Sequence, residues 1–320
     1  MIIDVVIFIV GLAVLSWSAD RFVYGSSALA KNLGVSPMVI GLTIVAMGSS
    51  APEIVVSATA SLAGNSNTAI GNAIGSNITN IALVLGVTAL IKPLLVSSTT
   101  VKREMPIVLI VSGLALYFLS DEVLSLNEGI VLIVLFFFVI GALSWMSWNV
   151  ESDDPLQAET EDEIPSNVNY PIAIFWVIVG ICLLPLSAHF MVDSAVSIAK
   201  AFGMSDLLIG LTIIAIGTSL PELAASIAGV MKGEDDLALG NIIGSNIFNI
   251  LAVLAMPGLI APGAIDANAA HRDIYIMFAL TALLLVFSFN MKGNRQIGRW
   301  KGGLLLLSFI AYELYLVASV

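Results

Sequence analysis

Hydrophobic residues follow one another along this chain in long runs, interrupted by proline, glycine and short charged connections. Each run holds roughly 17 to 29 residues with few charges, which is the length an α-helix needs to cross the hydrocarbon core of a bilayer. The pattern therefore predicts an all-α membrane protein with ten transmembrane helices. The expected spans are 2–29, 37–62, 68–91, 104–120, 125–147, 171–199, 206–231, 236–260, 273–290 and 302–319.

Composition strengthens this prediction. Of the 320 residues, 58% are hydrophobic and only 11% are charged, whereas soluble domains carry about 25% charged residues. A soluble globular protein is therefore excluded. The net charge is −11, and no basic patch is available for binding nucleic acid. With Cys182 as the single cysteine, no disulfide can form within the chain.

An acidic connection at 148–170 divides the ten expected spans into two sets of five, so we expect one unit at 1–147 and a second at 171–320. Its Asp, Glu, Pro and Ser content is typical of a solvated linker; a calcium-sensing role is a weaker alternative, because EF-hand spacing is absent. If the N-terminus lies outside, the inside connections carry nine Lys and Arg residues and the outside ones two. The positive-inside rule then predicts a multi-pass protein of the cell (inner) membrane, with both termini outside and the linker in the cytoplasm.

The two halves are related by an internal repeat. Adding 169 to a position between 35 and 93 gives its match between 204 and 262, and about half of the pairs are identical without a gap. Because each half has five spans, an odd number, the second half must enter the membrane from the opposite side. The sequence therefore predicts two inverted five-helix repeats, whose matching mid-span residues meet near the bilayer centre.

The most unusual repeated stretch places a proline and a glutamate at mid-span. Gly-Ser-Ser-Ala-Pro-Glu at 48–53 recurs as Gly-Thr-Ser-Leu-Pro-Glu at 217–222. Proline has no N–H to bond the carbonyl four residues earlier, so the helix should open there and free backbone carbonyls. A proline kink used only for packing is the simpler interpretation. The hydroxyls and the buried carboxylate, present in both copies, favour a functional site instead.

A second motif, Gly-Asn-x-Ile-Gly-Ser-Asn-Ile-x-Asn, occupies 71–80 and 240–249. Its glycines, four residues apart, predict close helix packing. Its polar residues at spacings of four form one stripe, and we expect Ser76, Asn80, Ser245 and Asn249 to contact ions or water. We give less weight to the first asparagine of each stripe, which lies nearer the helix start.

Together these motifs predict an all-oxygen site with no His, Cys or Met. The expected side-chain ligands are Glu53, Glu222, Ser49, Ser50, Thr218, Ser219, Ser76, Ser245, Asn80 and Asn249. Oxygen ligands suit hard cations such as Ca²⁺ and Na⁺, and disfavour zinc or copper. The two carboxylates carry a charge of −2, which one Ca²⁺ or two Na⁺ would neutralise; proton uptake is an open alternative. No catalytic constellation and no cofactor motif is present, so we do not expect an enzyme.

At these two motifs the chain resembles the cation/calcium exchanger superfamily, in particular its prokaryotic sodium/calcium antiporters. The resemblance covers essentially the whole chain. It implies ten spans and four ion sites in a diamond between spans two, three, seven and eight. It also implies backbone carbonyl ligands, from Thr43 and Thr212 at a central calcium site and from Ala46 and Ala215 at flanking sodium sites.

The resulting prediction is a sodium/calcium antiporter that works by alternating access at a midplane site. Its partners would be Ca²⁺, Na⁺ and the lipid bilayer, with no nucleic acid and no obligate protein partner. A proton-coupled or potassium-dependent exchanger is the alternative. Asn249 stands where potassium-dependent relatives carry Asp, which disfavours potassium, and the second motif helix lacks the extra acid usual in proton-coupled relatives. A channel would instead conduct without a counter-ion.

Overall fold

A computed structural model describes residues 2–34, 48, 50–96, 104–148, 168–232, 235–288 and 296–319. Three expected ligands (Thr43, Ala46 and Ser49) and most of the acidic linker lie outside these residues. The first-half elements are α1 (Ile2–Asn32), α4 (Ala51–Leu62), α5 (Ser66–Ile78), the π-helical turn η2 (Thr79–Val84), α6 (Leu85–Ile91), β1 (Leu94–Leu95), α7 (Met105–Leu119), β2 (Val123–Leu124) and α8 (Leu126–Trp148).

The second half repeats this order. Its elements are α10 (Tyr170–Ala201), α11 (Asp206–Ile209), η4 (Gly210–Ile214), α12 (Ala215–Thr218), α13 (Leu220–Lys232), α14 (Asp235–Phe248), η5 (Asn249–Val253), α15 (Ala255–Ile260), β3 (Gly263–Ala264), η6 (Ala269–Asp273), α16 (Ile274–Ser288), β4 (Gln296–Ile297) and α17 (Arg299–Ala318). Within the described ranges, seven helical stretches are long and apolar enough to cross a membrane, and three shorter apolar helices accompany them. The all-helical membrane architecture is thus confirmed. These stretches overlap all ten expected spans, but the number of membrane crossings stays a prediction.

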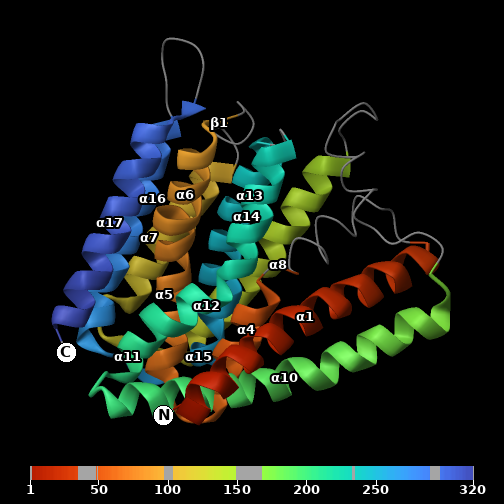
Figure 1. The fold of residues 1–320 in the computed structure, drawn as a ribbon, viewed down its shortest axis with the longest axis horizontal. Helices are drawn as coiled ribbons and strands as arrows, with labels where there is room; N and C mark the ends of the chain where they lie inside the picture. Colours follow the sequence, from red (N-terminus) through yellow and green to blue (C-terminus); the bar gives the residue numbers. More distant parts are fainter. Residues whose placement is uncertain are drawn as a thin grey trace.

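The helices α1 and α10 form a pair that lies obliquely across the bundle of shorter helices (Figure 1). They run antiparallel, because the end of α1 meets the start of α10. Tyr170 donates from its hydroxyl to the carbonyl of Asn32 at 2.6 Å, and the Asn32 amide donates to the carbonyl of Val168 at 2.8 Å. Since α10 is the repeat mate of α1, the two mates point in opposite directions.

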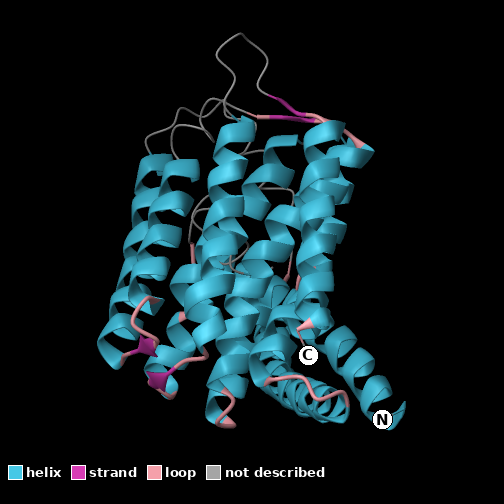
Figure 2. Cartoon of the chain, turned by 90° about the vertical axis from the view of Figure 1, so that its left-hand side faces the viewer, coloured by secondary structure: helices cyan, strands magenta, loops and turns pink. Residues whose placement is uncertain are grey.

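Two short antiparallel sheets lie at opposite ends of the bundle (Figure 2). At one end β1 pairs with β4, with Leu94 opposite Ile297; at the other β2 pairs with β3, with Leu124 opposite Gly263. Residues 94 and 263 are 169 apart, so β1 and β3 are also repeat mates. Their separation to opposite ends is the arrangement that an inverted repeat requires.

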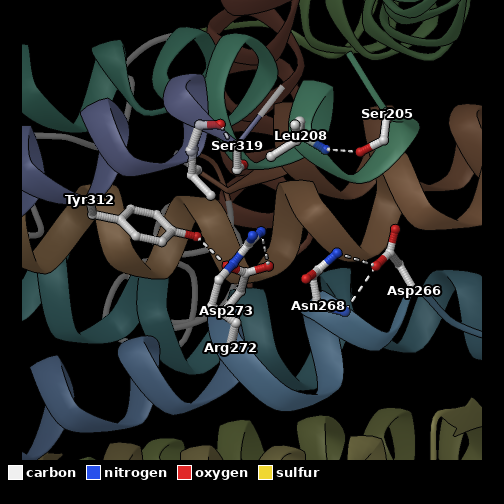
Figure 3. A network of polar contacts seen from close by, with 9 residues as sticks. Ser205, Leu208, Asp266, Asn268, Arg272, Asp273, Tyr312 and Ser319 are labelled. Atoms are coloured by element: carbon white, nitrogen blue, oxygen red, sulfur yellow. Dashed lines mark hydrogen bonds and ion pairs between the residues drawn. The ribbon is translucent and has the colours of Figure 1, made fainter. Parts of the chain in front are cut away.

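A buried polar cluster fixes α17 to the start of α16. Asp273, which is fully buried, accepts from Arg272 Nε at 2.7 Å and Nη2 at 3.1 Å, and from the Tyr312 hydroxyl at 2.9 Å (Figure 3). The bidentate guanidinium geometry is favourable for a charge held away from water. This cluster therefore ties two outer helices together at one end of the bundle.

The two halves approach most closely where α5 crosses α11 and η4. A Cβ atom on Gly71 would lie 2.5 Å from the Leu207 carbonyl oxygen, and one on Gly75 would lie 2.7 Å from that of Leu211. The predicted close packing is confirmed for this glycine pair. At Gly240 and Gly244, no described atom lies within 4 Å of an added Cβ. The segment that repeats 207–211 is 38–42, outside the described residues, so packing at the second pair stays a prediction.

Replacing Gly71 with Ala should lower the free energy of unfolding by about 1–3 kcal/mol, the usual cost of overpacking. The obstacle is the Leu207 carbonyl oxygen, which cannot move aside without shifting α11. Thermal unfolding of the purified protein in detergent would measure the change. The control is Gly141→Ala, because Gly141 has no described atom within 4 Å of its added Cβ. Equal unfolding temperatures for the two variants would contradict the close approach.

Candidate functional site

Both copies of the proline–glutamate motif begin a helix after the same backbone break. Ser50 precedes α4 with φ −91° and ψ 3°, and Ser219 precedes α13 with φ −86° and ψ 2°. At Ser219 one helix, α12, ends and the next begins, so the expected opening of the helix is confirmed in the second copy. Each proline takes the second helical position, where an N–H is not needed. Each glutamate follows in the first turn, where the helix dipole favours a negative charge.

The structure brings the two carboxylates together from opposite halves of the chain. Glu53 and Glu222 are each 1% exposed, and the charge of Glu53 acts on Glu222. The Thr218 side chain, from the second half, contacts the Asn72 side chain, which bonds the Glu53 carbonyl. None of the ion pairs between described residues involves either glutamate. The pair therefore consists of two buried carboxyl groups without a salt-bridge partner among the described residues.

Unpartnered oxygen atoms recur at matching positions of the two repeats. Among the described residues, buried side-chain oxygens without a hydrogen-bond partner include Ser50 Oγ and Ser219 Oγ, Glu53 Oε2 and Glu222 Oε2, and Asn80 Oδ1 and Asn249 Oδ1. A buried oxygen without a donor is costly unless another group satisfies it. Six such atoms, three from each half, match what a hard cation would take as ligands.

Asn72 connects the two motifs and the two halves. Its Nδ2 donates to the Glu53 carbonyl at 3.2 Å, and its Oδ1 accepts from the Ser76 hydroxyl at 3.4 Å. Thr218 Oγ1 lies 3.5 Å from the same Oδ1 and 3.1 Å from the Ile214 carbonyl, so its single proton serves one acceptor at a time. The sequence interpretation gave Asn72 less weight as an ion contact and did not predict these bonds. Its position at the head of the four-residue stripe was the available signal.

Wide helical turns shape the surroundings of the site. Asn80 lies in η2 and Asn249 begins η5, while Thr212 lies in η4. In η5 the Leu254 N–H bonds the Asn249 carbonyl, five residues back, at 2.9 Å. Such π-helical turns re-aim side chains and are frequent at functional sites. Hydropathy and residue spacing did not predict them.

The remaining expected ligands in the described residues are two serine side chains and two main-chain carbonyls. Ser76 and Ser245 are buried. The carbonyls of Thr212 and Ala215 each accept a main-chain hydrogen bond, from Ala215 N–H and Ser219 N–H. A carbonyl oxygen has a second lone pair, so these bonds leave room for a cation.

The chemistry available here is that of a hard-cation site. Across the described part of the chain, no group of three or more His, Cys, Asp and Glu residues could hold a metal ion. The donor set instead combines two carboxylates with hydroxyl, amide and carbonyl oxygens. Such a set suits hard cations such as Ca²⁺ or Na⁺, and not a soft transition metal.

Comparison with known proteins points in the same direction. The family described as sodium/calcium exchanger protein matches residues 3–145 and 172–318. A protein of Alkalimonas amylolytica, named as a candidate antiporter (CaxA), is 54% identical over 100% of both chains. The inner membrane protein YrbG of Escherichia coli is 41% identical, over 98% of this chain and 96% of its own. A solved structure of the sodium–calcium exchanger NCX_Mj superposes with a TM-score of 0.65 at 33% identity, covering 97% of each chain.

Replacing Asn72 with Leu should lower the free energy of unfolding by about 1–2 kcal/mol, because a buried side chain that joins both motifs loses its polar contacts. The unfolding temperature in detergent measures this effect. Ser76→Ala removes only the 3.4 Å contact and should cost under about 1 kcal/mol. An Asn72→Leu protein as stable as the wild type would show that these contacts contribute nothing.

Proposed function

This chain belongs to the sodium/calcium exchanger protein family, which consists of transporters and not enzymes, and on that premise we propose that it is a sodium/calcium antiporter. The observation that carries the proposal is the buried pair Glu53 and Glu222 with its repeat-related sets of unpartnered oxygens. A charge of −2 is neutralised by one Ca²⁺ or by two Na⁺. Full loads of both ions would leave excess positive charge in an apolar interior, so the ions compete.

The proposed ligands follow the two repeats. At a central calcium site we place Glu53 and Glu222 with the carbonyls of Thr43 and Thr212. At flanking sodium sites we place Ser50, Ser76, Ser219, Ser245 and the carbonyls of Ala46 and Ala215. The hydroxyls of Ser49 and Thr218 and the amides of Asn80 and Asn249 complete the polar lining.

Competition at one set of ligands produces exchange when the site opens alternately to the two sides of the membrane. We propose ten spans in two inverted repeats, 1–147 and 171–320, joined by a cytoplasmic linker at 148–170, with both termini outside. The antiparallel α1 and α10 and the separation of β1 from β3 support this arrangement. Because α1 and α10 are long and lie across the bundle, they are the proposed moving pair. If more than two Na⁺ exchange for one Ca²⁺, each net charge is worth about 2.3 kcal/mol per 100 mV.

Counter-ion dependence tests this function. In proteoliposomes of the purified protein, an imposed Na⁺ gradient should drive Ca²⁺ in the opposite direction, and removing Na⁺ should stop the flux. Flux that continues without Na⁺ and follows a pH gradient would establish the proton-coupled alternative instead. A requirement for K⁺ would establish the potassium-dependent one, and conductance without any counter-ion would indicate a channel.

Replacing Glu53 or Glu222 with Gln should reduce Ca²⁺ transport by about 100-fold or more, because each variant removes half of the charge that holds a buried divalent cation. The matched control is Glu122→Gln, whose carboxylate is 49% exposed and pairs with His271 at 2.8 Å. It should transport normally. Near-normal transport by either buried variant would refute the site.

A further inference from the structure

Two serines lie one helical turn beyond the buried carboxylates. Ser57 follows Glu53 by four residues on α4, and Ser226 follows Glu222 by four residues on α13, so each serine shares a helix face with its glutamate. The two serines are repeat mates, and both side chains are fully buried. Identical residues in identical positions would be expected to make the same contacts, but these two do not.

Ser57 forms a bond between the two halves. Its Oγ donates to the carbonyl of Val253 at 3.0 Å. The residue four positions after Val253 is Pro257, which has no N–H to complete the usual helical bond to that carbonyl. Ser57 thus supplies the donor that the proline lacks, and its own hydroxyl proton is fully used.

Ser226 has no such acceptor. The repeat mate of Val253 is Val84, and the mate of Pro257 is Thr88. Thr88 has the N–H that proline lacks, and its Oγ1 also donates to the Val84 carbonyl, at 2.7 Å. These two donors match the two lone pairs of that oxygen. Within the described residues, Ser226 Oγ has no hydrogen-bond partner at all.

The unpartnered hydroxyl continues a row of unpartnered oxygens. Ser219 Oγ and Glu222 Oε2 likewise lack partners among the described residues. Positions 219, 222 and 226 are three and four apart, so the row follows one face from the start of α13. A buried hydroxyl without a partner costs free energy that a bound cation would offset.

We propose that Ser226 is a cation ligand that extends the carboxylate site by one helical turn toward the Lys232 end of α13. The proposal rests on the cation-transport function proposed above. A serine hydroxyl is a hard oxygen donor, so the ligand is Na⁺ or Ca²⁺. The extension is proposed on this side only, because Ser57 Oγ is held toward the Val253 carbonyl of the other half. With both termini outside, this side faces the cytoplasm.

Equilibrium binding to the purified wild-type chain in detergent, with ⁴⁵Ca²⁺ and with Na⁺ titrated by calorimetry, tests the inference without relying on transport. Ser226→Ala should weaken the affinity for at least one of the two ions about 5- to 10-fold, and the two titrations identify which ion Ser226 binds. Ser226→Thr keeps the hydroxyl and should restore the affinity. Ser226→Cys keeps a side chain of similar size but replaces the hydroxyl with a thiol, which is a poor ligand for hard cations. It should weaken the affinity as Ser226→Ala does, and it leaves no cavity that could disturb folding.

Ser57→Ala is the matched control in the other repeat. It removes the donor to Val253, so it should lower the unfolding temperature and leave both ion affinities near those of the wild type. Wild-type affinities for both ions in Ser226→Ala and Ser226→Cys would overturn the inference. Loss of stability in those variants without loss of affinity would overturn it as well, by giving Ser226 a purely structural role. A wild-type protein that binds neither ion would overturn the proposed function itself.

Discussion

The pair of carboxylates in the apolar interior sets the conditions for the rest of the structure. Moving one isolated charge into such an environment costs of order 20 kcal/mol in the idealised limit, and two like charges add their repulsion. Among the described residues no cationic side chain pairs with Glu53 or Glu222. The other proposed ligands are neutral oxygen donors, which would stabilise a cation between the carboxylates and not the carboxylates alone. Under the proposed function, the charged state of the two carboxyl groups therefore depends on the bound ion.

Holding two glutamates from different halves within electrostatic reach requires the backbones to approach closely. Glycine meets this requirement at Gly71 and Gly75, where a Cβ would collide with the backbone oxygens of 207 and 211. Without a hydrophobic driving force between helices in lipid, such close packing and a few polar bonds must hold the halves together. The Ser57 bond to Val253 and the contact of Thr218 with Asn72 serve this purpose beside the site. The contacts that join the two halves thus lie on α4, which carries Glu53, and on the adjacent helix α5.

Much of the fold and of the candidate site could be predicted from the sequence, because the strongest sequence signals are local. Apolar runs set the helices, Pro52 and Pro221 set the breaks before each glutamate, and the 169-residue offset identified the matching positions. Long-range register was not predictable. The π-helical turns around Asn80 and Asn249, the central place of Asn72 and the acceptor of Ser57 all depend on which carbonyl of one half faces which side chain of the other. The oblique course of α1 and α10 likewise follows from packing between segments far apart in sequence.

The internal repeat also explains why small departures from it matter. An exact two-fold relation between inverted halves would give the two access states of a transporter the same energy, so each departure biases the populations of those states. Thr88 in the first repeat and Pro257 at the matching position of the second are such a departure. The proline leaves the Val253 carbonyl without its helical donor, whereas Thr88 supplies donors to the Val84 carbonyl. One half then has a serine bonded to the opposite half, and the other has a serine one turn from its glutamate whose hydroxyl has no partner among the described residues. Two repeats that are only half identical can therefore place matching carboxylates together while the serines beside those carboxylates make different contacts.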